Sequence, residues 1–216
     1  MNKMNTTLLL YIAVICGLTS CQSNSQYSRN DTTIVDVRIK QGQPLPAKEW
    51  HCYNVDNEEL ICIPQKWHFI NQDKYLLMAD LNTVDSNLYF VVLKHDKAAT
   101  GLTSTTYLKK IYQELKNDNR EKYCGFRVTK IKYEDKALFD GEFYTSVGNV
   151  NYVTLSEVFE KDNNLFELAL KTYRSRKKPE QETIKNILYN FYYKKNVVFS
   201  VHDKIIGFED VDITKL

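Results

Sequence analysis

The stretch "LFELALKTY", residues 165–173, alternates apolar and polar side chains with a period of two. Phe166, Leu168 and Leu170 share one face, and Glu167 and Lys171 share the other. This alternation predicts a β-strand that lays one face on a core and turns the other outward. It is the clearest strand pattern in the chain, and related patterns lie on its N-terminal side.

Three further strand-like runs precede it, at about residues 123–133, 137–144 and 151–159. The turns between the four runs, "YEDK", "SVGN" and "EKDNN", are short enough for an antiparallel meander. The run "NLYFVVLKH", residues 87–95, is apolar on both faces through its middle, which predicts a central strand. A shorter run, "ELICIP" at residues 59–64, also reads as a strand.

Two segments change to the helical period. In "TSTTYLKKIYQELKND" the apolar positions recur on one helical face, with N-cap residues at 103–105; the stripe is Leu108, Ile111, Tyr112 and Leu115. A second helix is predicted to begin at Pro179, with a stripe at Ile184, Ile187, Leu188, Phe191 and Tyr192. The predicted fold class is therefore α+β: an antiparallel sheet, built as a meander, with two main helices packed on it.

The composition is that of an ordinary soluble domain. The chain has 216 residues, 43% of them hydrophobic and 26% charged, and a formal net charge of +2. A balance this close to neutral gives no reason to expect nucleic acid as a partner.

The N-terminus has the pattern of an export signal. Lys3 precedes an apolar run at residues 8–17, which is shorter than the roughly 20 residues that span a bilayer. Small residues lead directly to a cysteine in Leu18-Thr19-Ser20-Cys21. Two other interpretations of this N-terminus remain open. It could be a secretory signal that is cleaved, with Cys21 present by chance, or a membrane helix that is retained.

Residues 18–21 resemble the lipobox of bacterial lipoproteins, in which an aliphatic residue and two small residues precede the cysteine. The resemblance implies that the Cys21 thiol carries diacylglycerol and that cleavage makes Cys21 the new N-terminus. It also implies a protein held in the cell envelope by its lipid. Gln22 follows the cysteine where lipoproteins retained at the inner membrane often have Asp, so we expect the outer membrane, facing the periplasm.

These patterns divide the chain into four parts. We expect a signal peptide at residues 1–20, a lipidated cysteine and flexible tether at 21–45, a single α+β domain at 46–202, and a C-terminal surface tail at 203–216.

In "ICIPQKWHFI", residues 61–70, a predicted strand ends in proline and is followed by a gap and a tryptophan. This stretch and the order of the later elements resemble PsbP-like and DcrB-like domains. The resemblance would cover about residues 58–200. That family shares no catalytic set that could be placed on this chain, so the resemblance implies a binding or assembly module.

Three cysteines remain after processing. Cys52 and Cys62 could form a disulfide, although the position of Cys62 inside an apolar strand favours buried, reduced thiols. Cys124 is the third. The spacing of Cys52 and Cys62 with His51 and His68 lacks the tight pairs of zinc sites, so no metal is predicted.

Neither catalytic residues nor a cofactor can be assigned from the sequence. It contains no Gly-x-Ser-x-Gly elbow, no His-Glu-x-x-His and no glycine-rich phosphate loop. An enzyme is disfavoured, but it is not excluded, because residues distant in sequence can converge in space.

The most distinctive surface feature is a basic run of Arg174, Arg176, Lys177 and Lys178, expected in the loop before the second helix. A solvated loop is the simplest interpretation. The functional one is a contact for anionic lipid headgroups or an acidic partner.

The sequence thus favours an envelope lipoprotein whose domain binds a protein partner or supports an assembly without catalysis. The alternatives are an immunity or inhibitor lipoprotein that neutralises a toxin in the periplasm, and a hydrolase or small-ligand carrier. Nucleic acid is not an expected partner.

Overall fold

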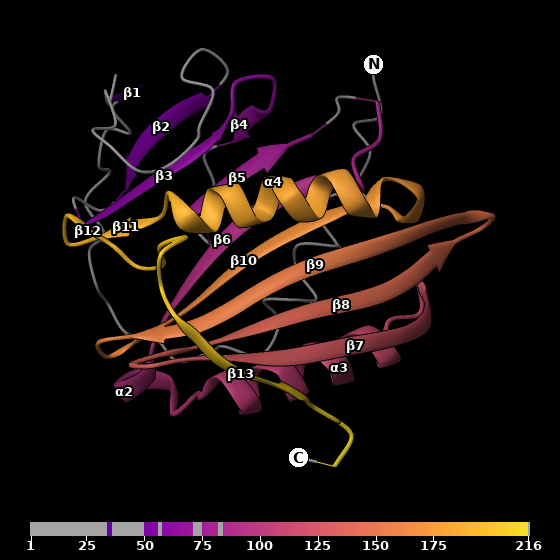
Figure 1. The fold of residues 1–216 in the computed structure, drawn as a ribbon. Coiled ribbons are helices and arrows are strands. Elements are labelled where there is room, and N and C mark those ends of the chain that lie inside the picture. Colours follow the sequence, from indigo (N-terminus) through magenta and orange to yellow (C-terminus); the bar gives the residue numbers. More distant parts are fainter. Residues whose placement is uncertain (1–33, 36–49, 56–57, 71–74, 82–83, 216) are drawn as a thin grey trace. The chain divides into compact units, whose positions relative to one another are not determined.

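The meander predicted from the sequence forms the middle of an antiparallel sheet (Figure 1). Strands β7 (Lys122–Tyr133), β8 (Ala137–Val147), β9 (Val150–Lys161) and β10 (Asn164–Tyr173) pair in sequence order. This computed structural model describes residues 34–35, 50–55, 58–70, 75–81 and 84–215, which all belong to one unit, Thr32–Leu216.

The sheet continues beyond the meander on both sides. Strands β6 (Tyr89–Asp96), β5 (Leu77–Asp80) and β4 (His68–Ile70) follow β10, and β13 (Ile205–Asp210) pairs with β7. Within the described part of the chain the order is β13-β7-β8-β9-β10-β6-β5-β4. The apolar run at 87–95 thus lies inside the sheet as β6, as predicted.

A second, smaller sheet packs against the same core. It contains β1 (Ile34–Val35), β2 (Trp50–Val55), β3 (Glu59–Pro64), β11 (Tyr192–Tyr193) and β12 (Asn196–Val197), in the order β1-β2-β3-β11-β12. Its short C-terminal strands join residues that follow the last helix to residues near the start of the domain.

The helices begin where local capping allows. Helix α3 (Ser104–Asn117) is capped by Thr103, whose hydroxyl oxygen accepts from the backbone N–H of Thr106 in a capping box. A short helix, α2 (Lys97–Thr100), was not predicted; Asp96 accepts from the backbone at its start.

The last helix starts earlier and ends earlier than predicted. After the 3-10 turn η1 (Arg174–Arg176), α4 runs from Lys177 to Tyr189, so Pro179 lies within its first turn. Phe191 and Tyr192, expected on its buried stripe, lie beyond it.

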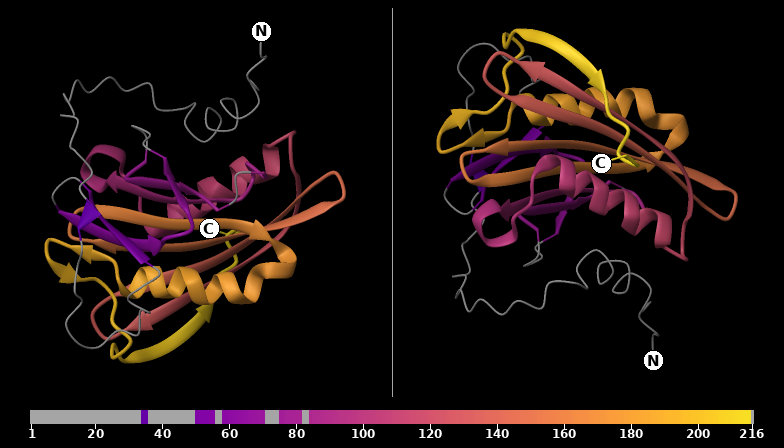
Figure 2. Two further views of the ribbon diagram at one scale, coloured as in Figure 1. Left: turned by 90° about the horizontal axis from the view of Figure 1, so that it is seen from above. Right: turned by 90° about the horizontal axis from the view of Figure 1, so that it is seen from below.

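The large sheet has a helix on each face (Figure 2). Under α4 and the small sheet, a core of buried aromatic and aliphatic side chains includes Phe159, Phe166, Phe191 and Phe199. On the opposite face, α3 covers a second core around Phe143 and Leu108. Sheets with helices segregated in this way confirm the α+β prediction.

Two boundaries differ from the predicted division. Residues 203–216 were expected to be a surface tail, yet they contain β13, and Ile213 is fully buried in the core under α3. Within the predicted tether, residues 34–35 form β1 and pair with β2. The predicted signal peptide lies outside the described residues, and no helix among those described has the length and apolar character needed to cross a membrane.

Candidate interaction surface

A groove lies where the β8–β9 turn meets the end of β10. Its volume is about 460 Å3, and it is lined by Asn149, Val150, Asn151, Tyr173, Arg174 and Ser175. The turn places Gly148 at φ +57°, a left-handed conformation that favours glycine because it has no Cβ. This tight turn brings Asn149 and Val150 to the groove.

Hydrogen bonds hold the tyrosine wall of the groove in place. The hydroxyl of Tyr173 donates to Asp85 at 2.7 Å, and that of Tyr152 donates to the same carboxylate at 3.2 Å. Burial acts to raise the pKa of Asp85, but these hydrogen bonds and those from Asn87 outweigh it and lower the pKa. Asp85 is therefore an ionised anchor that fixes the ends of β9 and β10.

The structure brings one residue of the predicted basic run into the groove and pairs two others with acids. Arg174 lines the groove. Lys177 binds Glu142 on β8 at 2.6 Å, and Arg176 binds Glu180 at 2.9 Å. The segment is a 3-10 turn and the start of a helix rather than the loop that was predicted.

The contact between Lys177 and Glu142 fastens the start of α4 to the sheet. Burial would raise the pKa of Glu142, but hydrogen bonds from Lys177 and Tyr144 outweigh it and hold the pKa below its usual range. Gln181 also donates to this carboxylate, at 2.8 Å. Lys177 is thus occupied by a structural contact.

Two cations are left for a partner. Arg174 is exposed, and its guanidinium lies 4.9 Å from the ring centre of Tyr144. A stacked guanidinium keeps its outer N–H groups available, because the ring contact uses only its face. Lys178 is also exposed, and within the described residues neither cation has a carboxylate partner. Of the four basic residues predicted to contact an anionic partner, Arg174 and Lys178 are therefore the two that form no ion pair among the described residues.

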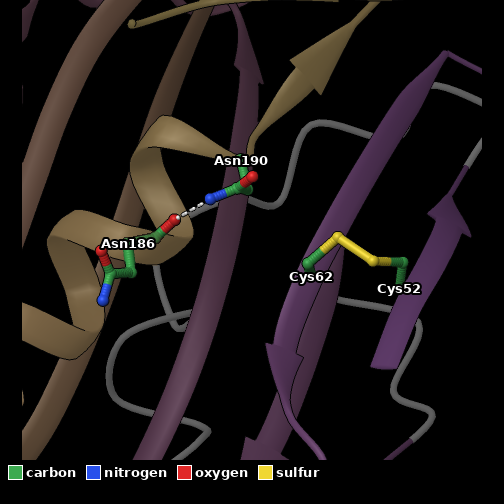
Figure 3. The surroundings of a disulfide bond; sticks show 4 residues. All are labelled: Cys52, Cys62, Asn186 and Asn190. Atoms are coloured by element: carbon green, nitrogen blue, oxygen red, sulfur yellow. Dashed lines mark hydrogen bonds between the residues drawn. A yellow bond between two sulfur atoms is a disulfide. The ribbon is translucent and has the colours of Figure 1, made fainter. Parts of the chain in front are cut away.

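The cysteine pair lies near the other end of α4 (Figure 3). Cys52 and Cys62 are cross-strand neighbours on β2 and β3, and they form a disulfide rather than the reduced thiols that the sequence favoured. The strand register explains the bond, since it places the two Cα atoms 4.0 Å apart. At the end of α4 beside this hairpin, the side chain of Asn190 donates to the Asn186 carbonyl at 2.8 Å.

No metal site emerges from the part of the chain that the structure describes: it contains no group of three or more His, Cys, Asp or Glu side chains placed to hold an ion. Cys124 is a free, exposed thiol. Cys21, the predicted lipidation site, lies outside the described residues.

Sequence reasoning missed the residues that shape the groove. Asp85 lies 88 positions from Tyr173, so no local pattern joins them. The available signal was the turn "SVGN" beside "VNY", which predicts a hairpin tip but does not show which segment packs beside it.

Comparison with known proteins shows a similarity of fold only. No protein-family model matches the sequence, and no curated protein matches it. Among solved structures, the cyanobacterial PsbP (CyanoP) of Synechocystis is similar with a TM-score of 0.50 and 12% identity, covering 72% of this chain and 98% of that one.

LpqN of Mycobacterium tuberculosis, described as involved in cell envelope biogenesis, aligns with a TM-score of 0.42 and 9% identity, covering 63% of this chain and 83% of that one. The similarity to CyanoP confirms the PsbP-like part of the predicted resemblance at the level of fold. An identity of 12% carries the comparison no further than the fold.

Proposed function

We propose that this chain is a lipid-anchored cell-envelope protein whose PsbP-like domain binds an acidic protein partner without catalysing a reaction. The observation that carries the binding role is that Arg174, an exposed cation without a carboxylate partner among the described residues, lines the groove, and that Lys178, four positions on along the chain, is a second such cation. A guanidinium on a groove wall recognises a carboxylate through paired, charge-assisted hydrogen bonds.

The proposed attachment to the cell envelope rests on Leu18-Thr19-Ser20-Cys21 and the apolar run before it. Each buried CH2 of an acyl chain contributes about 0.8 kcal/mol, so two or more chains anchor a folded domain stably. With Gln22 after the cysteine, the proposed location is the outer membrane, with the domain in the periplasm.

The anchor is tested by Cys21→Ser in the full chain. Because a hydroxyl cannot replace the thiol in the thioether, we expect the variant to leave the membrane fraction for the soluble periplasmic fraction. Cys16→Ser is the matched control, since Cys16 lies in the predicted signal and leaves with it. Equal membrane recovery of both variants would refute the anchor.

The groove is tested by the double variant Arg174→Glu/Lys178→Glu. The lipidated chain is cross-linked in membranes and captured, and its partners are identified by mass spectrometry. Reversal of both charges should reduce recovery of the specific partner at least tenfold. Lys161→Glu/Lys195→Glu applies the same charge change at exposed positions outside the groove lining and should leave recovery unchanged.

One observation supports a second candidate, a carrier of a small anionic ligand. The groove volume of about 460 Å3 lies within the range of about 300–1,000 Å3 typical of small-molecule sites. Native mass spectrometry of protein released from membranes would show a bound small molecule, and Val150→Trp, which fills the groove, should remove it. A protein partner captured without such a molecule would reject this candidate.

A further inference from the structure

The strand β13 is an open edge of the large sheet. It pairs with β7 on one side, and within the described residues no strand pairs with its other side. Its apolar side chains are unusually exposed: Ile205 by 44%, Ile206 by 58% and Phe208 by 69%. An edge strand with a free backbone and exposed apolar residues is a template for another strand.

The sequence of this edge is complementary to itself. The segment reads Lys204-Ile205-Ile206-Gly207-Phe208-Glu209-Asp210. Two copies placed antiparallel, with the two-fold axis at Gly207, set Lys204 opposite Asp210 and Ile206 opposite Phe208, each contact occurring twice. Two of the three opposed pairs are therefore complementary, one by charge and one by apolar contact, whereas the third places Ile205 opposite Glu209.

A bulge accounts for the glycine at the middle of this segment. The register of β13 on β7 shifts between Ile205 and Gly207, and glycine inside a strand often marks such a bulge. A Cβ built at Gly207 would meet nothing within 4 Å, so a side chain can be introduced there as a probe.

The charges at the ends of the segment make only exposed contacts, since Asp210 accepts a hydrogen bond from the Thr129 hydroxyl at 3.3 Å. Lys204 binds Glu134 at 3.0 Å, but both side chains are mostly exposed, by 74% and 63%. Exposed pairs of this kind contribute little to stability, so Lys204 can turn to Asp210 of another copy with little loss.

We propose that β13 is the interface of a homodimer, in which two copies pair their β13 strands antiparallel about Gly207 and join their sheets. This goes beyond the proposed function and does not depend on the groove. The contact is small compared with the 1,200–2,000 Å² of stable interfaces, so we expect a reversible dimer.

Disulfide trapping tests the register. Gly207→Cys is introduced into the full chain in a Cys124→Ser background, so that no native free thiol described in the structure remains. Antiparallel pairing about residue 207 places the two new thiols within reach of a disulfide. Mild oxidation in membranes should give at least tenfold more cross-linked homodimer than Lys161→Cys in the same background, an exposed position at the end of β9 and away from the edge.

A charge swap tests the pairing itself. Added to Gly207→Cys, Lys204→Asp should reduce cross-linking about tenfold, because it places two acids opposite each other, and Lys204→Asp/Asp210→Lys should restore it. Cross-linking no greater than the Lys161→Cys control, or no restoration by the swap, would overturn the proposal. A cross-link to a different protein would also overturn it.

A second measurement needs no cysteine. Phe208→Asp places a charge at the centre of the proposed contact, on a side chain that is exposed in the single copy. In detergent extracts, sedimentation should show the native chain in equilibrium between dimer and monomer and the variant as monomer. An identical distribution for both would contradict the interface.

Discussion

The two faces of the large sheet each hold a lysine bound to acids, but they hold it differently. Under α3, Lys171 of β10 binds Glu121, with the two side chains only 2% and 1% exposed. Under α4, Lys185 of the helix binds Asp140 at 3.0 Å and Glu157 at 2.6 Å, and its own side chain is 27% exposed. Lys171 is thus enclosed, whereas Lys185 is partly exposed to solvent.

The pKa values of the two lysines move in opposite directions. Burial lowers the pKa of Lys171, and the attraction of Glu121 offsets this only in part. Burial also acts to lower the pKa of Lys185, but the carboxylates of Glu157 and Asp140 outweigh it and raise the pKa. The comparison teaches that exposure decides the direction of the shift: at the partly exposed Lys185 the attraction of the two bound acids outweighs dehydration, whereas at the enclosed Lys171 dehydration outweighs the attraction of Glu121 and the smaller contributions of Asp118 and Asp85.

The largest expected effect follows from breaking the enclosed pair. Lys171→Met removes a cation that binds the buried Glu121 carboxylate, which should lower the free energy of unfolding by about 3–5 kcal/mol. Urea denaturation of the full chain, followed by tryptophan fluorescence, measures the change.

The matched control removes both partners. Lys171→Met/Glu121→Leu replaces the charges with apolar side chains, so we expect it to recover at least half of the loss. If the double variant is no more stable than Lys171→Met, lost packing rather than the buried charge of Glu121 accounts for the effect.

The next effect is a pH dependence on the α4 face. Burial, with a smaller contribution from the charge of Asp140, raises the pKa of Glu157 from 4.5 to about 8, although Lys185 opposes the shift. The folded chain thus binds this proton more tightly than the unfolded chain does. The stability that the proton provides is present below pH 4.5 and is lost as the pH rises through 8.

Glu157→Gln should remove this dependence. Between pH 5.5 and 8.5 the native chain should lose about 3 kcal/mol more of its unfolding free energy than the variant loses. Glu142→Gln is the control: because the pKa of Glu142 is lowered, its contribution is lost only at more acidic pH and stays constant across this range. Parallel pH profiles for the native chain and Glu157→Gln would show that Glu157 is ionised throughout.

The same two faces show which features of the fold could be predicted from the sequence. The alternation in residues 165–173 correctly assigned Phe166, Leu168 and Leu170 to the core under α4. It also suggested that Glu167 and Lys171 face outward, yet they are only 5% and 1% exposed. Alternation tells which side chains share a face of a strand, but it carries no information on what covers that face.

Long-range pairing accounts for the remaining differences. The tail predicted at 203–216 becomes β13 because β7 offers it an edge, a contact between segments about 75–80 positions apart that no local pattern records. In the basic run, the ion pair of Arg176 could be predicted from the sequence, because Glu180 lies four positions on along a helix. The ion pair of Lys177 could not, because Glu142 lies on a strand 35 residues earlier.

The smallest effect is expected at the most exposed of these pairs. Arg176 is 54% exposed although its partner Glu180 is only 8% exposed, so water remains at the guanidinium. Arg176→Gln should change the free energy of unfolding by about 0.5 kcal/mol or less, the usual range for a helical pair four residues apart. The same urea denaturation measures it, in 0.1 M and 1 M salt. A loss as large as that of Lys171→Met would mean that enclosure of the acid, rather than of the cation, determines the contribution of each pair.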